Sequence, residues 1–293
     1  MRAFHPEWAP EIELTAGDNY THAVILNTCM PALVGSVPRA NVIGLAFEPR
    51  PYLFITAEFV AYARRHIGKY LVGDASGLGE PFVEGFAYKW RHVLVPPVER
   101  ALIRPPNVVS IMVSKKLWGP GNKYRHALAR RILRSNLPVD IWGNGCDLLV
   151  SSSQTPVQAP KFRHMMRNIM QNAPPTSQSP LNPLNPNDSR LRGPFINSEP
   201  FDGYAFHVAI ENYQSGHYIS EKILDPLAYG CTPVYLGSPY IDSYFPGMVI
   251  TLSGNEDRDM ALLARICADS VGMRRPVDLE HVLRVQDMSG DFV

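Results

Sequence analysis

Short apolar runs alternate with amphipathic stretches along the chain, and this alternation predicts its fold class. Runs of strand length lie at Ala23–Leu26, Asn41–Phe47, Asn107–Val113, Pro138–Trp142, Tyr204–Ile210 and Thr232–Leu236. Apolar residues recur at helical spacing over Glu58–Tyr70, Lys123–Leu137 and Ser220–Tyr229. Strands that alternate with helices are typical of a parallel sheet covered by helices. We therefore predict an α/β chain.

The length and the prolines predict how this chain is divided. It has 293 residues, which is long for a single hydrophobic core, and Pro96-Pro97 interrupts the apolar pattern. We predict three parts: an N-terminal domain over 1–100, a C-terminal domain over 101–275 and a C-terminal tail over 276–293. A proline-rich stretch over 173–200 predicts a long loop. The sequence leaves open whether this loop is a lid over a binding site.

The charge and the apolar runs of the sequence limit the kinds of partner that the chain can have. The chain carries 28 basic and 27 acidic residues, so its net charge is +1. A nucleic-acid binder normally has a basic excess or face, and this class is therefore disfavoured. There is no signal-peptide pattern and no apolar run of about 18 residues, the length of a membrane span. We expect a soluble or cytoplasmic chain, whose separated cysteines (Cys29, Cys146, Cys231 and Cys267) are reduced and buried.

The first candidate site residue follows the strand that ends at Ile210. Parallel sheets bind ligands at the carboxyl ends of their strands, and the chain turns there at Gly216 before a helix begins. Ser220 can cap the first amides of this helix, which leaves Lys222 in its first turn. A lysine there opposes the helix dipole, which suits a bound anion such as a diphosphate. An exposed lysine without a ligand is equally compatible with this local pattern.

The second candidate is Arg125, near the start of the helix that follows the strand ending at Val113. It precedes Leu128 by three residues and Ala129 by four, so it lies on the apolar face of that helix. A buried guanidinium needs an acidic partner, and a phosphate would provide one through paired hydrogen bonds. An internal salt bridge would satisfy it as well.

The segment from Tyr204 to Gly237 resembles a known family. It contains Glu211-Asn212, then Tyr218-Ile-Ser-Glu-Lys222, then Gly230-Cys-Thr-Pro-Val-Tyr-Leu-Gly237. Residues, order and spacing are similar to the signature of the α-1,3/1,4-fucosyltransferases, glycosyltransferase family 10. The rest of the chain resembles this family only in the order of its elements.

The resemblance implies a GT-B fold, in which two Rossmann-like domains face each other across a cleft. It implies an inverting transfer of L-fucose from GDP-β-L-fucose to a hydroxyl of an oligosaccharide or glycoconjugate acceptor. By position, Tyr218, Glu221 and Lys222 would contact the donor, and Asn212 would shape the same pocket. Arg125 is similar to the family's phosphate-binding arginine, so with Lys222 it would neutralise the departing diphosphate.

An inverting displacement also needs a base on the acceptor side. Glu48 follows the strand Asn41–Phe47, at a position similar to that of the family's base, and we predict that it takes the proton. Arg50 lies close by in sequence and could tune it. The alternative is a surface glutamate before a proline turn.

Two departures from the family pattern widen the range of donors. Ala205 stands where the family has a lysine, and Tyr213 stands where it has a serine. The same fold could therefore use another nucleotide sugar such as UDP-xylose. A protein that binds a nucleotide sugar or glycan without turnover is also compatible. The sequence does not identify the acceptor, the linkage or the oligomeric state.

No metal site is expected. Asp257-Arg-Asp259 resembles a metal-binding Asp-x-Asp motif, but it falls at the predicted start of a helix, where acids suit the dipole. The histidines lack the spacing of metal ligands. Basic side chains and helix amides can replace a metal in a GT-B enzyme, so no cofactor is required, although Mn²⁺ or Mg²⁺ could stimulate the reaction.

Overall fold

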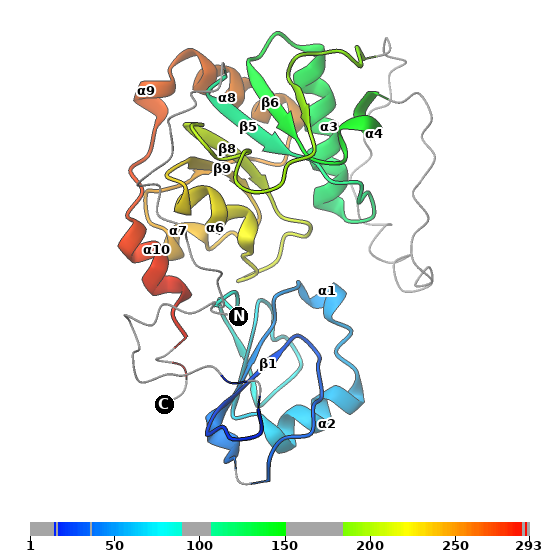
Figure 1. Cartoon of the computed structure of the whole chain (residues 1–293), viewed down its shortest axis with the longest axis vertical. Coiled ribbons are helices and arrows are strands. Elements are labelled where there is room, and N and C mark those ends of the chain that lie inside the picture. Colours follow the sequence, from blue (N-terminus) through cyan, green and yellow to red (C-terminus); the bar gives the residue numbers. More distant parts are fainter. Residues whose placement is uncertain are drawn as a thin grey trace.

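The computed structural model describes residues 15, 17–35, 37–89, 107–150, 184–288 and 291. These residues form two parallel sheets, one built from each half of the chain (Figure 1). The first sheet contains β1 to β4 and the second contains β5 to β10. The predicted α/β architecture with two parallel sheets, as expected of a GT-B fold, is confirmed.

The first sheet has the strand order β1-β2-β3-β4, and each strand is parallel to its neighbour. Its elements are β1 (Ala23–Leu26), η1 (Arg39–Asn41), β2 (Val42–Leu45), α1 (Arg50–Leu53), α2 (Ala57–His66), β3 (Lys69–Val72) and β4 (Phe82–Glu84). Helix α2 begins at Thr56, whose side chain accepts from the Phe59 amide, and it buries Phe59 and Ala63 against the sheet.

The predicted helix Glu58–Tyr70 is wrong at its end. Helix α2 stops at His66, and Tyr70 lies in β3 instead. The reason is the contact that Gly68 makes with η1, because a Cβ atom on Gly68 would lie 2.7 Å from the Arg39 carbonyl oxygen. The chain therefore leaves the helix here and enters the sheet. Because Gly68 and Arg39 are far apart in sequence, the helical spacing of nearby residues does not reveal this contact.

The second sheet has the order β10-β9-β8-β5-β6-β7, again all parallel. Its strands are β5 (Val109–Met112), β6 (Val139–Trp142), β7 (Leu191–Gly193), β8 (Phe206–Ile210), β9 (Thr232–Leu236) and β10 (Ile250–Thr251). Strands β6 and β7 follow one another outward on one side of β5. Strands β8, β9 and β10 follow one another outward on its other side. The direction of winding thus reverses between β5 and β8, the arrangement of a doubly wound sheet.

Helices flank the second sheet. They are α3 (Pro120–Arg134), α4 (Cys146–Val150), α6 (Glu221–Ala228), α7 (Ile241–Tyr244), α8 (Glu256–Ala268), α9 (Ser270–Met273) and α10 (Leu279–Gln286). Helix α3 buries Leu128, Ala129 and Ile132 in the core of this sheet. Helix α6 is followed by Gly230, whose φ of 73° is the predicted left-handed end. Within the described ranges, no helix has both the length and the apolar character needed to cross a bilayer.

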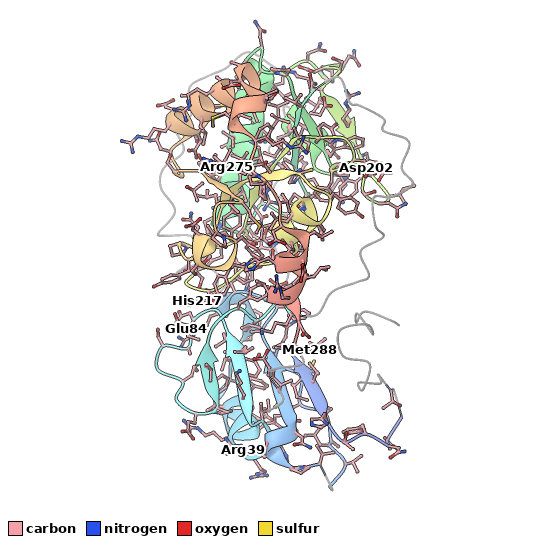
Figure 2. All side chains as sticks on the ribbon, turned by 90° about the vertical axis from the view of Figure 1, so that its left-hand side faces the viewer. Arg39, Glu84, Asp202, His217, Arg275 and Met288 are labelled. Atoms are coloured by element: carbon pink, nitrogen blue, oxygen red, sulfur yellow. The ribbon has the colours of Figure 1, made fainter. Side chains whose placement is uncertain are left out.

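The carboxyl ends of the two sheets face one another. The Gly73 carbonyl, just after β3, accepts a hydrogen bond of 2.8 Å from the His217 amide. A Cβ atom on Gly73 would lie 2.7 Å from the Tyr218 nitrogen, so only glycine allows this approach. The Glu84 carboxylate lies 3.7 Å from the His217 ring, at the boundary between the sheets (Figure 2).

Each half also contributes a residue to the core of the other. Phe86, which follows β4, is buried among residues of α6, α7 and α10. Met288, which follows α10, is buried in the core of the first sheet. The segment predicted as a tail over 276–293 thus contains α10 and returns to the first sheet (Figure 1). The predicted boundary near residue 100 lies outside the described residues.

Two smaller expectations need correction. Part of the predicted loop 173–200 forms β7, which pairs with β6, while residues 173–183 lie outside the described ranges. Cys146 and Cys231 are buried free thiols as predicted, but Cys29 is exposed.

A buried polar network in the second sheet gives a stability prediction. The fully buried Asp140 carboxylate on β6 accepts from Asn107 (2.7 Å), Tyr204 (2.7 Å) and Arg192 (3.1 Å). Asp140→Ala leaves these donors unpaired, so we expect the free energy of unfolding in denaturant to fall by about 3–5 kcal/mol. The control Asp147→Ala, which removes an exposed carboxylate, should change it by less than about 1 kcal/mol. Equal effects of the two variants would contradict this account.

Candidate functional site

The predicted site residues meet where the winding of the second sheet reverses. Strands β5 and β8 are neighbours there, and the chain leaves their carboxyl ends toward α3 and α6. A crevice forms at this point of a doubly wound sheet because the two connections diverge to opposite faces. Arg125 comes from α3, Lys222 comes from α6, and the loop from Glu211 to Ser220 lies between them.

The Glu211 carboxylate is the best-held group of the site, and it is fully buried. It accepts a hydrogen bond of 2.9 Å from the Ser220 amide and one of 2.7 Å from Ser220 Oγ. Burial raises its pKa, although Lys222 acts in the opposite direction. Ser220 also caps α6 as predicted, since its Oγ accepts from the Lys222 amide. One carboxylate therefore fixes the start of α6 against the end of β8.

Lys222 is paired with carboxylates. Its Nζ lies 2.9 Å from Glu221 Oε1 and 3.6 Å from Glu211 Oε2, and its side chain is only 15 % exposed. Burial opposes its charge, but these two acids outweigh burial and raise its pKa. The expectation of a lysine that is free for a phosphate is therefore not met, because two carboxylates pair with Lys222. A bound diphosphate would have to replace or outcompete these partners.

Arg125 occupies the buried face of α3, as its spacing predicts. Its Nη2 donates to the Ile210 carbonyl and to Asn212 Oδ1, the latter at 3.5 Å. Burial lowers its pKa, and the charges of Glu211 and Glu221 partly offset this. Its hydrogen bonds to the described residues both start from Nη2.

Tyr218 and Asn212 belong to the same cluster. Tyr218 is buried beside Gly73 at the junction of the sheets, and burial, with Glu211 and Glu221 nearby, raises its pKa well above the usual range. Asn212 orients Arg125 through its side chain and accepts from the Gly121 amide through its carbonyl (3.1 Å). Asn212 thus ties the end of β8 to the first turn of α3.

Glu48 faces this cluster from the first sheet, three residues after β2. Its side chain stays accessible to solvent, but partial desolvation by the neighbouring residues raises its pKa. Lys222 and Lys116 lower this pKa and Glu221 raises it, so residues of the second half act on a carboxylate of the first. Arg50 does not tune Glu48 as expected, because its guanidinium binds Asp74 and the Ser76 carbonyl.

The charges of the cluster compensate one another. Two cations, Arg125 and Lys222, stand among three carboxylates, Glu211, Glu221 and Glu48. With all three carboxylates ionised this set would repel an anion. Burial raises the pKa of Glu211, and proton uptake at this one carboxylate would bring the set to neutrality while Glu48 stays ionised.

The sequence did not single out the aromatic residues at this junction. Tyr52 on α1 packs edge-on against Trp118 at 4.6 Å and against Tyr213 at 6.1 Å, both from the second half. The Glu-Asn pair of the motif contains Glu211, but its ion pair with Lys222 was not predicted. Tyr213 had a signal, as a departure from the family pattern, whereas Tyr52 and Trp118 had none.

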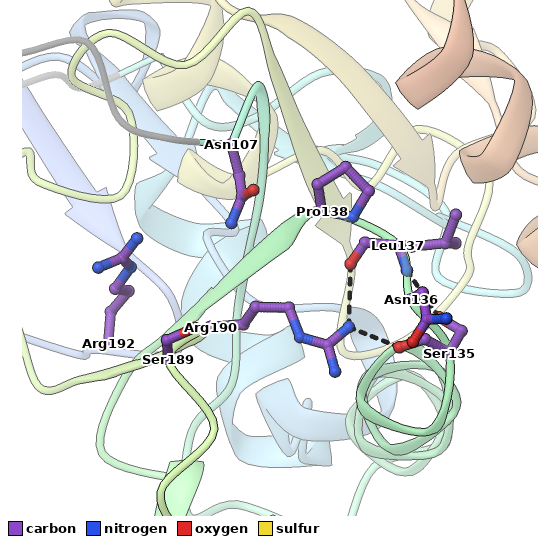
Figure 3. A pocket seen from close by; sticks show the side chains of 8 residues that line it. All are labelled: Asn107, Ser135, Asn136, Leu137, Pro138, Ser189, Arg190 and Arg192. Atoms are coloured by element: carbon purple, nitrogen blue, oxygen red, sulfur yellow. Dashed lines mark hydrogen bonds between the residues drawn. The ribbon is translucent and has the colours of Figure 1, made fainter.

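A cavity of about 550 Å³ lies at the other end of the second sheet (Figure 3). Asn107 and Pro138, which line it, precede β5 and β6, so it opens at the amino ends of the strands. Arg190 on its wall donates to carbonyls at the end of α3, including those of Ser135 and Leu137. These contacts cap a helix, and the cavity contains none of the predicted site residues.

The Asp257-Arg-Asp259 motif has the structural role that was predicted. Asp259 is buried in α8, and its oxygens accept from Ser253 (2.7 Å), Gly254 (3.0 Å) and Tyr124 (2.5 Å). Asp257 pairs with Arg131 at 2.6 Å. Across the described ranges, no three His, Cys, Asp or Glu side chains are grouped as metal ligands.

No protein-family model matches the chain. Among solved structures, an α1,3-fucosyltransferase with GDP aligns over 94 % of this chain and 71 % of its own, with 15 % identity and a TM-score of 0.44. Anabaena Alr3699/HepE with UDP-glucose aligns over 86 % and 70 %, with 11 % identity and a TM-score of 0.47. The pneumococcal O-GlcNAc transferase GtfA with UDP and GlcNAc aligns over 86 % and 51 %, with 12 % identity and a TM-score of 0.42. These similarities concern the fold, and the bound nucleotides differ.

The charge compensation gives a prediction that inorganic pyrophosphate can test. Glu211→Gln keeps an acceptor for the Ser220 amide but removes a negative charge beside Lys222. We expect the variant to bind pyrophosphate more tightly than wild type, by on the order of tenfold at pH 8, and the ratio should fall as the pH is lowered toward the raised pKa of Glu211. Calorimetry across this pH range measures the ratio of the two affinities. Protonation of pyrophosphate itself affects both proteins equally and cancels in this ratio.

The matched control is Glu256→Gln, which makes the same charge change on α8 beside Arg131. It should leave the affinity within twofold of wild type at every pH. A ratio of one for Glu211→Gln throughout would show that Lys222 is not restrained by Glu211.

Proposed function

We propose that the chain is an inverting glycosyltransferase that moves a sugar from a nucleoside diphosphate to a hydroxyl of a glycan. GDP-β-L-fucose is the preferred donor and an α-1,3-linkage the preferred product, because the motif from Glu211 to Gly237 resembles that of the fucosyltransferases. UDP-xylose or another nucleotide sugar is the alternative that Ala205 and Tyr213 keep open.

One observation carries this proposal. Two cations from separate helices, the buried Arg125 and the partly buried Lys222, converge at the winding reversal of one sheet, and Glu48 faces them from the other sheet. Such a crevice is where doubly wound sheets bind nucleotides. A base opposite a cationic seat is what an inverting displacement requires, because the attacking and leaving oxygens lie on opposite sides of the anomeric carbon.

In the proposed reaction, the acceptor oxygen forms a bond to the anomeric carbon while the bond from that carbon to the diphosphate oxygen breaks. Glu48 accepts the proton of the acceptor hydroxyl. Arg125 and Lys222 stabilise the negative charge that develops on the leaving diphosphate. The reaction consumes one nucleotide sugar and releases a nucleoside diphosphate and one proton, which Glu48 gives to solvent.

The proposal requires no metal ion. Arg125, Lys222 and the amides at the start of α6 supply the charge that a metal would otherwise provide. Mn²⁺ or Mg²⁺ could still stimulate turnover by binding the released diphosphate.

The first test separates the donor seat from the base. Arg125→Ala and Lys222→Ala should each lower donor turnover by at least about a hundredfold, since each removes a charge that contacts the leaving group. Glu48→Gln should not weaken nucleotide binding, since it removes a negative charge from the cluster, but it should lower transfer by about a thousandfold. Radiolabelled transfer from GDP-fucose and UDP-xylose measures turnover, and calorimetry with GDP and UDP measures binding. Turnover near wild type in both cation variants would refute the seat.

The second test uses the pH profile of Glu48. A base must be ionised, so the raised pKa of Glu48 places the acid limb of kcat/KM above the ordinary glutamate pKa of 4.5. Lys116 lowers this pKa and no ion pair holds its side chain within the described residues, so Lys116→Met should move the limb to higher pH. Lys123→Met on α3 is the control and should leave it in place. A limb unmoved by Lys116→Met would mean that another group is the base.

A further inference from the structure

The cavity at the amino ends of the second sheet lies apart from the site of the proposed reaction (Figure 3). Its volume of about 550 Å³ falls within the range of small-molecule sites, which is roughly 300–1,000 Å³. Its walls come from the loop between α3 and β6, from the residues that lead into β7 and from Asn107 before β5. Among the described residues, these walls contain two arginines and no acidic residue. The cavity therefore offers both space and positive charge to a ligand.

Arg190, the first of these arginines, is fully used within the protein. Its guanidinium donates to carbonyl oxygens at the end of α3, among them those of Ile132 and Leu133, and to both carboxylate oxygens of Asp188. The end of a helix carries a partial negative charge, which would repel an anion. Because Arg190 covers these carbonyl oxygens, this wall tolerates an anionic ligand, although Arg190 has no donor left to bind one.

Arg192, the second arginine, has donors left for a ligand. Its Nη2 donates to the fully buried Asp140, while its Nη1 makes no hydrogen bond to the described residues. Its side chain is 30 % exposed and its Nε is buried, so a ligand in the cavity meets the guanidinium at its Nη1 end. The N–H groups at this end match the paired oxygens of a carboxylate, and the charge strengthens such hydrogen bonds.

Uncharged polar groups around the cavity provide further hydrogen bonds. Asn136 and Ser189 are exposed, and their side chains make no hydrogen bond to the described residues. Asn107 uses its Nδ2 within the protein, which leaves its Oδ1 as an acceptor. Leu137 and Pro138 add a small apolar surface. This combination matches a sugar ring, because sugar hydroxyls both donate and accept and the C–H groups of the ring are apolar.

We propose that this cavity binds an acidic sugar, which is a hydroxylated ring that carries one carboxylate. Arg192 binds the carboxylate, and the side chains of Asn107, Asn136 and Ser189 bind hydroxyls of the ring. The site goes beyond the proposed function and does not depend on it, because the donor and base residues lie at the carboxyl ends of the strands. The acidic sugar is either a free molecule or one unit of a glycan chain.

Titration of the full chain with three small probes, followed by NMR, tests the class of ligand. The probes are D-glucuronate, D-glucose, which has the ring without the carboxylate, and acetate, which has the carboxylate without the ring. Wild type should bind glucuronate with a dissociation constant of about 1 mM. It should bind glucose and acetate at least about tenfold more weakly, since each lacks part of the contacts. Equal affinity for glucuronate and either of the other probes overturns the inference.

Two variants test the location of the site. Arg192→Gln removes the cation, so the preference for glucuronate over glucose should fall from about tenfold to about one. Asn136→Ala removes an exposed amide and should weaken glucuronate binding by about fivefold, the effect of one lost hydrogen bond. The matched control is Asn197→Ala, which removes an exposed amide beyond the other end of β7 and should leave the affinity unchanged. Asn136→Ala tests the inference even if Arg192→Gln fails to fold, which its melting temperature reports.

The outcomes are distinct from those of the proposed function. A preference for glucuronate that survives Arg192→Gln overturns the inference, and so does an Asn136→Ala variant that binds like Asn197→Ala. Arg125→Ala and Lys222→Ala, which test the proposed function, should leave glucuronate binding unchanged, because neither residue lines the cavity.

A tetrasaccharide of hyaluronan, which contains the same uronate within a chain, distinguishes the two sources of the ligand. Binding at least about tenfold tighter than glucuronate identifies a unit of a glycan chain, because neighbouring sugars then add contacts. Equal or weaker binding identifies the free acidic sugar.

Discussion

The buried carboxylate of Glu211 is the constraint from which the geometry of the site follows. A charge without exposure must be satisfied locally, and Ser220 provides both its amide and its hydroxyl, with Lys222 close by. Space is equally constrained, since a Cβ atom on Gly237 would lie 2.6 Å from Glu211 Cγ and one on Gly121 would collide with its carbonyl oxygen. The ends of β8 and β9 and the starts of α3 and α6 are thus held around one side chain.

Arg125 and Lys222 stand among three carboxylates, so the cluster has no net positive charge while at least two of the carboxylates are ionised. A ligand must therefore release Lys222 from its carboxylates or bring protons to them. Ligands of low charge gain little from that exchange, whereas a diphosphate gains interactions with both Lys222 and Arg125. Under the proposed function, such a charge-compensated cluster would favour highly charged ligands, and its carboxylates hold Lys222 in place beforehand. Electrostatic stabilisation of a leaving group requires preorganisation of this kind.

Local pattern was sufficient to predict two of the four strands of the first sheet and four of the six strands of the second, the Ser220 cap and the left-handed Gly230, because each depends on neighbours in sequence. It also placed Arg125 on the buried face of α3.

Contacts between segments that are distant in sequence could not be predicted from the local pattern. The end of α2 depends on Gly68 meeting η1, the pairing of Lys222 depends on how deeply Glu211 is buried, and the packing of Tyr52 against Trp118 joins two halves of the chain.

The role assigned to Glu48 depends on how the halves dock more than on its own surroundings. Its charged neighbours Lys222, Glu221 and Lys116 all belong to the second half, so its pKa is a property of the assembled junction. That junction is set by residues with no part in the chemistry: the backbone contact of Gly73 with His217 and the reciprocal burial of Phe86 and Met288. If Glu48 is the base, its ionisation is tuned only when the two halves are docked. In the proposed reaction, proton abstraction and diphosphate binding are therefore coupled through the docking of the halves.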